Sequence, residues 1–263
     1  MRKLTHLSLF TGIGGLDLAA EWAGFETVGQ CEFADFPTRV LEKHWPDVPR
    51  WRDIRTLTKE NFYERTGLRT IDVISGGFPC QPFSTAGLRR GKDDDRYLWP
   101  EMLRVVEALR PTWVVGENVA GIGNMALDDI LTDLEAINYS ARALMVPAAG
   151  VGAPHRRDRF AILANSHRCG DCGAIEKKSD ASPTRTNNFL KWQWYQGGNQ
   201  QSSGLGGGQG GDQWASEPSV GRVADGVPNR MDRLKCLGNA VVPQVFFPIF
   251  SAIAEIEKGG DAD

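Results

Sequence analysis

Short apolar runs alternate with helical patterns along the first 165 residues of the chain. The runs at residues 4–10, 27–31, 71–74, 113–116 and 160–164 predict buried strands, and residues 140–146 are strand-like. Between them, apolar residues recur at helical spacing in residues 16–23, 34–44, 98–110 and 128–137. Strands that alternate with helices are typical of an α/β fold with a mostly parallel sheet. We therefore predict one α/β domain over residues 1–165.

The composition of the chain changes near Asn165. Residues 166–220 are rich in Gly, Gln, Ser and Asn, with tryptophans scattered among them, and part of this stretch resembles a flexible linker. We predict a small irregular domain at residues 166–230. Apolar patterning returns after it, and residues 245–256 predict a closing helix that packs back on the first domain. Residues 231–263 are therefore assigned to a C-terminal segment of the first domain.

Charge and cysteine usage narrow the class of protein. The 263-residue chain has a formal net charge of −3, which argues against an indiscriminately basic nucleic-acid-binding protein but leaves room for a local basic cleft. Basic clusters lie at residues 89–92, 155–159 and 177–178, and each one alone is typical of a solvated surface. The five scattered cysteines form no disulfide framework, which suits a reducing compartment.

Targeting and metal-binding patterns are weak in this sequence. The start of the chain has no signal-peptide pattern, and no apolar run is long enough to span a bilayer, so we expect a cytoplasmic protein that does not bind membranes. Cys169 and Cys172 form one Cys-x-x-Cys pair without a second pair. Structural zinc needs about four ligands, so we expect no metal.

The stretch around Cys80 is the most informative part of the chain. The predicted strand at residues 71–74 breaks into Gly76-Gly77, whose missing side chains permit a sharp turn or a close approach to a ligand. Cys80 follows between Pro79 and Pro82, at the strand end where open α/β sheets bind ligands. A cysteine on so stiff a loop is placed as a nucleophile would be. The alternative is a buried structural cysteine.

The first strand runs into a glycine turn at residues 10–15, and a helix follows at once. This arrangement offers backbone N–H groups and a helix start to a nucleotide-like ligand, although a tight structural turn would look the same. The spacing departs from the dinucleotide fingerprint, because Leu16-Asp17 stands where the third glycine belongs. That departure disfavours an NAD-dependent oxidoreductase.

Two acidic residues follow the next strands. Glu32 ends the second strand, where a carboxylate accepts hydrogen bonds from ribose hydroxyls, and Phe33 beside it is able to stack on a purine. Asp53, next to Ile54, supplies an acceptor for a purine amino group. Without further context, an exposed loop acid and a core phenylalanine explain Glu32 and Phe33 equally well.

Taken together, these motifs resemble the DNA cytosine-C5 methyltransferase family. The sequence Pro79-Cys80-Gln81-Pro82-Phe83-Ser84 resembles its catalytic loop, residues 10–15 its S-adenosylmethionine loop, Glu117-Asn118-Val119 its Glu-Asn-Val motif and residues 238–243 its last motif. The motifs occur in the family's order and cover almost the whole chain outside residues 166–230. The resemblance implies a Rossmann-like S-adenosylmethionine-dependent methyltransferase sheet with a small irregular target-recognition domain.

The resemblance also assigns roles to individual residues. The catalytic set is Cys80, Glu117, Arg157 and Arg159. The cofactor-binding set is Phe10, Gly12, Ile13, Gly14, Gly15, Glu32, Phe33, Asp53, Ile54, Pro79, Leu98, Asn239, Ala240 and Val241. The implied cofactor is S-adenosylmethionine and the implied partner is double-stranded DNA, with no obligate protein partner and a monomeric chain. Chains this compact resemble phage or prophage members, which implies the cytoplasm of a bacterial or phage-infected host.

Two departures from the family pattern stand out. The usual Gln-x-Arg-x-Arg is His155-Arg156-Arg157-Asp158-Arg159 here, so both arginines are kept and the glutamine is not. The long penultimate motif is not recognisable, and residues 217–226 stand in its position. That motif helps to organise the target-recognition domain, so how residues 166–230 pack is left open.

The chemistry explains why these residue types are needed. Cytosine C5 is too electron-poor to attack a sulfonium methyl group until a thiolate has added at C6. A free cysteine has a pKa of about 8.5, and nearby positive groups such as Arg157 and Arg159 raise the thiolate fraction. The resemblance implies that Glu117 acts as a general acid toward cytosine N3. An RNA cytosine methyltransferase shares this chemistry, and a catalytically silent DNA-binding homologue shares the fold, so both stay open beside the DNA methyltransferase.

Overall fold

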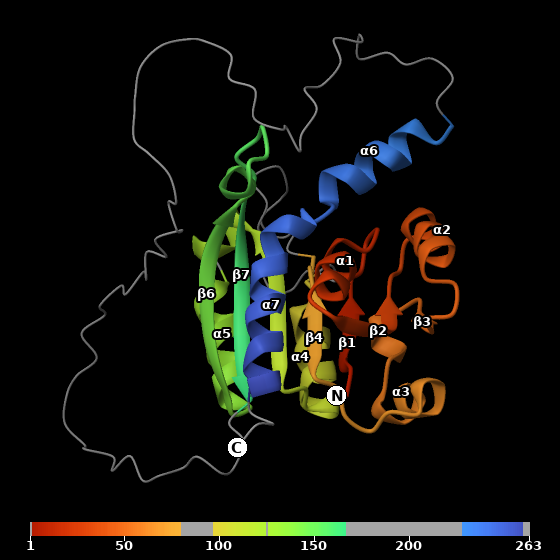
Figure 1. Ribbon diagram of the computed structural model, residues 1–263, viewed down its shortest axis with the longest axis vertical. Helices are drawn as coiled ribbons and strands as arrows, with labels where there is room; N and C mark the ends of the chain where they lie inside the picture. The colour runs from red at the N-terminus through yellow and green to blue at the C-terminus, as the bar shows by residue number, and fades with distance from the viewer. Residues whose placement is uncertain (1, 80–96, 125, 167–227, 260–263) are drawn as a thin grey trace, which may run out of the picture.

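A seven-stranded sheet forms the centre of the computed structural model, which describes residues 2–79, 97–124, 126–166 and 228–259 (Figure 1). The strand order is β3-β2-β1-β4-β5-β7-β6. The strands are β1 Leu4–Leu9, β2 Phe25–Cys31, β3 Arg50–Trp51, β4 Val73–Gly76, β5 Trp113–Val119, β6 Tyr139–Pro147 and β7 Asp158–Ser166. The α/β fold predicted from the alternating patterns is confirmed.

The direction of the strands follows the prediction except at one edge. The pairs from β3 through β5 are all parallel, whereas β7 is antiparallel to both β5 and β6. The sheet is therefore mostly parallel, as expected. Because β7 runs backwards, its first residues lie at the edge where the parallel strands have their carboxyl ends.

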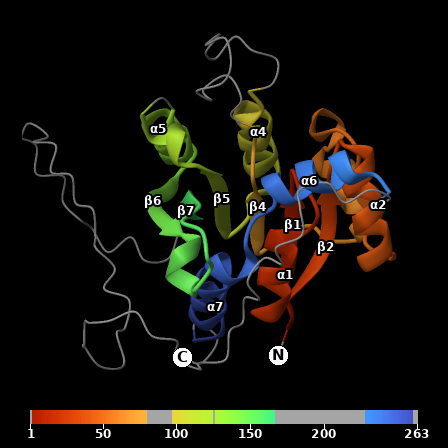
Figure 2. The ribbon, with the colours of Figure 1, turned by 90° about the horizontal axis from the view of Figure 1, so that it is seen from above.

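Helices cover both faces of the sheet (Figure 2). Helices α1 Gly15–Trp22 and α7 Pro243–Gly259 lie on one face, and α4 Trp99–Leu109 and α5 Leu127–Ala136 on the other. Each face has its own apolar core. The first is built on Leu16, Ala19, Phe246 and Phe250, and the second includes Trp99, Met102, Ile130 and Leu134.

Helix α7, near the C-terminal end of the chain, packs back on the sheet. Helix α7 packs on α1, with Phe246 and Phe250 fully buried, because its apolar residues recur at helical spacing on one face. Trp113 Nε1 of β5 also donates to Glu257 Oε1 at 2.9 Å. The predicted closing helix is confirmed. The predicted irregular domain falls almost wholly on residues 167–227, outside the described residues.

Several short elements complete the fold. Helix α2 Asp35–His44 follows β2, and α6 Arg230–Asn239 precedes α7. Helix α3 Lys59–Thr66 has no counterpart in the predicted elements, and it begins at a capping box in which Thr58 and Asn61 satisfy each other's backbone N–H groups. The 3₁₀ turns are η1 Ile54–Thr56, η4 Ala120–Asn124 and η5 Ala148–Val151.

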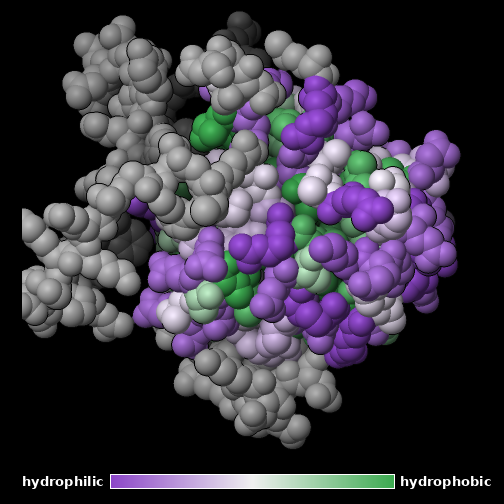
Figure 3. All heavy atoms as spheres, turned by 90° about the horizontal axis from the view of Figure 1, so that it is seen from below, coloured by the Kyte–Doolittle hydropathy of each residue, from purple (hydrophilic) through white to green (hydrophobic). Residues whose placement is uncertain are grey.

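Two surface properties of the described residues complete the picture. No single helix among them has both the length and the apolar character needed to cross a membrane, although the bent pair of α6 and α7 meets that test together by length and composition. The end of the molecule opposite α6 is mainly hydrophilic, with hydrophobic residues in small separate patches (Figure 3).

Candidate active site at the carboxyl edge of the sheet

Most of the described residues that are predicted for the site lie at one edge of the sheet. The parallel strands β1, β2, β4 and β5 end there, and the antiparallel strand β7 begins there. In open α/β sheets this edge is where ligands bind. The site has two halves, one at the ends of β1 and β2 and the other at the ends of β4 and β5.

The glycine turn after β1 is braced by backbone and side-chain hydrogen bonds. Thr11 N donates to Cys31 O at 3.1 Å, Gly14 N donates to Thr11 O at 3.0 Å, and Gly12 N donates to Glu32 Oε2 at 2.8 Å. Phe10 has a φ of 51°, which is unfavourable for a residue with a side chain and is typical of functional turns. A Cβ atom added at Gly12 would meet no atom within 4 Å, so space is open beside the turn.

Close packing requires glycine at positions 14 and 15, whereas the space beside Gly12 is open. A Cβ atom on Gly14 would lie 2.5 Å from the Trp45 ring, and φ at this position is 89°. A Cβ atom on Gly15 would lie 2.6 Å from Val241 O. The first turn of α1 therefore touches the backbone of residues 238–243 directly, and only glycine permits this approach.

Glu32 and Asp53 lie at the ends of neighbouring strands. Glu32 Oε1 accepts from Ala34 N at 2.8 Å, so each carboxylate oxygen already receives one backbone N–H. Glu32 N donates to Trp51 O, which ties the end of β2 to β3. Asp53 Oδ1 accepts from Arg55 N at 3.0 Å and pairs with the Arg55 guanidinium at 3.6 Å. Burial, together with Glu32 and Asp53 nearby, raises the pKa of Cys31 to about 12, so this thiol stays protonated.

The other residues predicted for cofactor binding differ in exposure. Phe33 is 74% exposed at the end of β2, whereas Ile54 is buried in the core. Leu98 is half-buried at the start of α4, and Leu98 O accepts from Met102 N. Ile13 lies in the glycine turn, and Asn239, Ala240 and Val241 join α6 to α7. Phe33 and residues 239–241 thus present surface at this edge, while Ile54 contributes packing.

Glu117 and Arg159 form a partly buried ion pair in the other half of the site. Arg159 Nε lies 2.9 Å from Glu117 Oε1, with side-chain exposures of 20% and 11%. The pair forms because β7 is antiparallel to β5, which places Arg159 opposite Val119, two residues beyond Glu117. A Cβ atom on Gly77 would lie 3.0 Å from Glu117 Oε2, so Gly77 leaves room for this carboxylate.

Burial raises the pKa of Glu117 above its ordinary value. The positive charges of Arg159 and Arg157 and the hydrogen bond from Arg159 oppose this effect without cancelling it. A glutamate in this state holds its proton to a higher pH than one in water. The shift favours the protonated carboxyl that a general acid requires.

Asn118 connects this half of the site to the cysteine loop, and the predicted site did not include it. Asn118 Nδ2 donates to Phe78 O at 3.0 Å, and its Oδ1 accepts from Val119 N at 2.9 Å. Asn118 thereby fixes the end of β5 against Phe78 and Pro79, which lead directly into Cys80. Cys80 itself lies outside the described residues. The position of Asn118 within Glu117-Asn118-Val119 is the signal that marks it in the sequence.

Arg157 has a different environment from Arg159. Its Nη2 donates to Gly238 O and to Ala240 O, both at 2.7 Å. Its backbone has a φ of 42°. Burial lowers the pKa of Arg157, Arg159 lowers it further, and Glu117 partly opposes the shift. Arg157 therefore contacts residues next to the glycine turn while lying in the electrostatic environment of the Glu117–Arg159 pair.

The carboxylate of Asp17, which the predicted site did not include, is buried beside the strands that lead into the glycine turn and Glu32. Asp17 in the first turn of α1 accepts from Ser8 Oγ and from Gln30 Nε2, both at 2.9 Å. Gln30 Oε1 in turn accepts from Arg50 Nε at 2.9 Å. The network joins β1, α1, β2 and β3. An acidic residue in a first helical turn is ordinarily a solvated partner of the helix dipole, so the sequence carries no signal of its burial.

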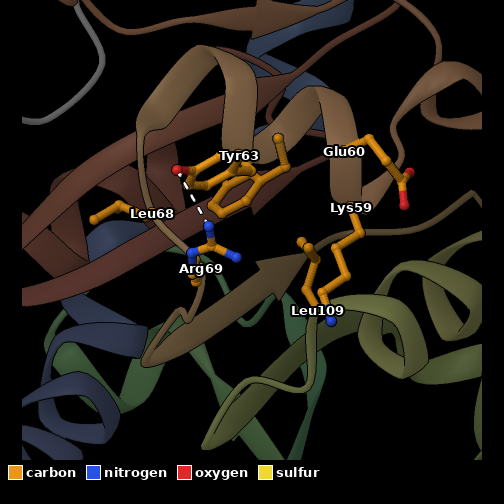
Figure 4. Close-up of a pocket in the computed structure, with 7 residues that line it drawn as sticks. Lys59, Glu60, Tyr63, Leu68, Arg69 and Leu109 are labelled. Atoms are coloured by element: carbon orange, nitrogen blue, oxygen red, sulfur yellow. Dashed lines mark hydrogen bonds between the residues drawn. The ribbon is translucent and has the colours of Figure 1, made fainter.

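A pocket of about 310 Å³ lies away from this edge (Figure 4). Its lining includes Tyr63, Leu68 and Arg69, and the Arg69 guanidinium lies over the Tyr63 ring at 4.5 Å. Leu109, the last residue of α4, also lines it, which places the pocket toward the amino ends of the parallel strands. None of the residues predicted for the site lines this pocket, so it is separate from the candidate active site.

Comparison with known proteins decides the family. The C-5 cytosine-specific DNA methylase family matches residues 4–191. This chain belongs to that family. The match covers the glycine turn, Glu32, the Cys80 loop and the Glu117–Arg159 pair in one continuous stretch, whereas residues 238–243 lie outside it.

The relatives include named bacterial methyltransferases. The type II methyltransferase M1.HphI of Haemophilus parahaemolyticus is 32% identical over 61% of this chain and 45% of its own length. The type II methyltransferase M.AquIA of Picosynechococcus is 36% identical over 60% of this chain and 71% of its own length. This chain spans about half the length of most of the curated relatives that it matches.

A solved structure shares the fold. A DNA modification methyltransferase encoded within an Escherichia coli prophage aligns with a TM-score of 0.54 and 28% identity, over 62% of this chain and 47% of that protein. The alignment thus covers part of each chain. The fold is therefore the Rossmann-like methyltransferase sheet expected from the sequence.

Proposed function

We propose that this chain transfers a methyl group from S-adenosylmethionine to C5 of a flipped-out cytosine in a specific duplex DNA sequence. The observation that carries the proposal is the Glu117–Arg159 pair, a buried carboxyl with a raised pKa beside the segment that leads into Cys80. Membership in the C-5 cytosine-specific DNA methylase family supports the reaction class.

The first half of the site fits the cofactor. S-adenosylmethionine supplies an electrophilic methyl group on a sulfonium sulfur. The open space beside Gly12 would receive it, and the Glu32 carboxylate would accept hydrogen bonds from its ribose hydroxyls. The exposed Phe33 ring would stack on the adenine. The Asp53 carboxylate, which accepts one bond from Arg55 N, would accept a further hydrogen bond from the adenine amino group.

The second half performs the chemistry on the base. The Cys80 thiolate adds to cytosine C6 while Glu117 gives its proton to N3, which makes C5 nucleophilic. C5 then bonds to the methyl carbon as the methyl–sulfur bond breaks. A base removes the C5 proton, the released electron pair expels the Cys80 thiolate, and N3 returns its proton to Glu117. Arg159 holds the Glu117 carboxyl in place through these steps, and Asn118 holds the start of the cysteine loop.

The target base has to leave the duplex before this chemistry begins. Flipping a base costs a few kcal/mol of stacking and pairing, which contacts to the extrahelical base and the DNA backbone offset. We assign reading of the DNA sequence to residues 166–230, because the motifs shared with the family serve the cofactor and the flipped base. The proposal places the protein in the cytoplasm as a monomer that acts on double-stranded DNA.

Methyl transfer from tritiated S-adenosylmethionine to duplex DNA and to RNA tests the function. We expect label in duplex DNA, in the parent but not in Cys80→Ala, and a covalent adduct with a duplex that carries 5-fluorocytosine at the target only for the parent. Cys80→Ala should still bind S-adenosylhomocysteine, which controls for folding. Label in RNA alone would reassign the substrate, and activity in Cys80→Ala would refute the mechanism.

A further inference from the structure

The chain at the end of α6, residues 238–241, is held from two sides by residues far away in the sequence. On one side, Arg157 Nη2 donates to Gly238 O and Ala240 O at 2.7 Å each. On the other side, Val241 O lies so close to Gly15 that a Cβ atom there would be 2.6 Å from it. The segment therefore has contact with both Arg157 and the glycine turn.

The carbonyls that Arg157 binds are ones that need a partner. Gly238 lies in the last turn of α6, and Ala240 follows the helix, so Gly238 O lacks an intrahelical donor. A cation at a helix C-terminus also interacts favourably with the helix dipole. Arg157 thus acts as the C-cap of a helix whose ten residues include no buried side chain.

The backbone of Arg157 is itself fixed. Arg156 O accepts from Ala148 N at 2.9 Å and from Ala149 N at 3.4 Å, which ties the chain just before Arg157 to η5. The φ of 42° at Arg157 is unfavourable for a residue with a side chain. Such a conformation persists only where surrounding contacts impose it, and it occurs mainly at functional positions. These contacts therefore hold the backbone that carries the Arg157 side chain.

We propose that Arg157 is a positioning residue that holds the Asn239–Val241 segment against the glycine turn and so couples the cofactor half of the site to the base half. The inference rests on the proposed function. Arg157 lies two residues before Arg159, which pairs with Glu117, so one short stretch of chain contacts both halves. Its guanidinium group binds two backbone carbonyls of this segment.

Binding of S-adenosylhomocysteine in the absence of DNA, measured by calorimetry, tests the role of Arg157. For Arg157→Gln we expect the Kd to rise roughly 10-fold or more, since hydrogen bonds from a charged donor are lost. Hydrogen exchange of the peptide that contains residues 238–242 should become faster in the ligand-free variant. Arg157→Lys, which keeps a charged donor, should recover part of the affinity.

Arg156→Gln is the matched control. Arg156 is the adjacent arginine, its side chain is 83% exposed, and it pairs with Asp158 at 2.8 Å. Its replacement should leave both the Kd and the exchange of residues 238–242 unchanged. This variant loses the same charge from the same loop. It therefore separates the hydrogen bonds from Arg157 to Gly238 and Ala240, which we call the clamp, from a general effect of charge.

Alkylation of Cys80 separates the clamp from a direct effect on the nucleophile. The rate is followed with iodoacetamide across a pH series, on the Cys80 peptide by mass spectrometry. The Arg157→Gln profile should match the parent profile. A Kd for Arg157→Gln within twofold of the parent value would overturn the proposal, whether or not the alkylation profile shifts. A parent that binds S-adenosylhomocysteine but methylates no nucleic acid would refute the proposed function and leave the clamp standing.

Discussion

The buried carboxyl of Asp17 should make the stability of this protein depend on pH in a direction opposite to that of a salt-bridged acid. Burial raises the pKa of Asp17 from 3.8 to about 6, with Glu21 adding to the shift and the hydrogen bonds from Gln30, Ser8 and the backbone opposing it. The native state therefore keeps this proton to a higher pH than the unfolded chain. The free energy of unfolding falls as the pH rises from about 4 to about 6, and the loss is complete above that range.

The size of the effect follows from the shift. A difference of about two pH units corresponds to roughly 3 kcal/mol, because one unit corresponds to 1.36 kcal/mol. Asp17→Asn removes this titration and places an amide against Gln30 Nε2, which adds a penalty that does not depend on pH. The difference in unfolding free energy, parent minus variant, should therefore fall by roughly 3 kcal/mol between pH 4 and pH 8.

Urea unfolding followed by tryptophan fluorescence at a series of pH values measures that difference. Asp72→Asn is the control. Burial alone would raise the pKa of Asp72, but hydrogen bonds from Arg2 and Thr5 outweigh it and lower the pKa. Asp72 thus stabilises the fold above its unfolded pKa, and its parent-minus-variant difference should be flat above about pH 4 and fall below it. A flat difference for Asp17→Asn would show that Asp17 ionises normally in the native state.

Two further predictions concern the reaction and its specificity. Glu117→Gln keeps an acceptor for Arg159 but cannot give a proton to N3, so the single-turnover rate should fall by roughly 10²–10⁴ with the fold intact. An unchanged rate would mean that Glu117 serves only as the partner of Arg159. Replacing residues 166–230 with a short glycine linker should preserve S-adenosylhomocysteine binding and abolish methylation at a defined sequence, measured by sequencing methylated positions. Specific methylation by the shortened chain would place recognition elsewhere, with residues 87–96 as the first region to test.

Much of the fold could be read from local patterns. Apolar runs and helical spacing indicate which face of each element is buried. The pattern is local, because a stretch of about ten residues contains it. The glycine turn at residues 10–15 and Glu32 could be placed at one edge because successive parallel strands share their carboxyl edge. The closing helix α7 was predictable from its own pattern, because a helix with an apolar stripe needs a partner that covers the stripe.

The sequence alone did not determine how distant segments meet. A buried strand at residues 160–164 has the same apolar pattern in either direction, and only the antiparallel pairing of β7 with β5 brings Arg159 to Glu117. The bonds from Arg157 to Gly238 and Ala240 span 81 and 83 residues, and the sequence does not distinguish them from a role at Cys80.

The burial of Asp17 was likewise decided by tertiary packing. One carboxyl in the first turn of a helix looks solvated in the sequence, yet Ser8, Gln30 and the elements around them enclose it completely. Periodicity along the chain specifies which residues turn inward on each element. It does not specify which element packs against these residues, because that depends on strand order, strand direction and the contacts of segments far apart in the chain.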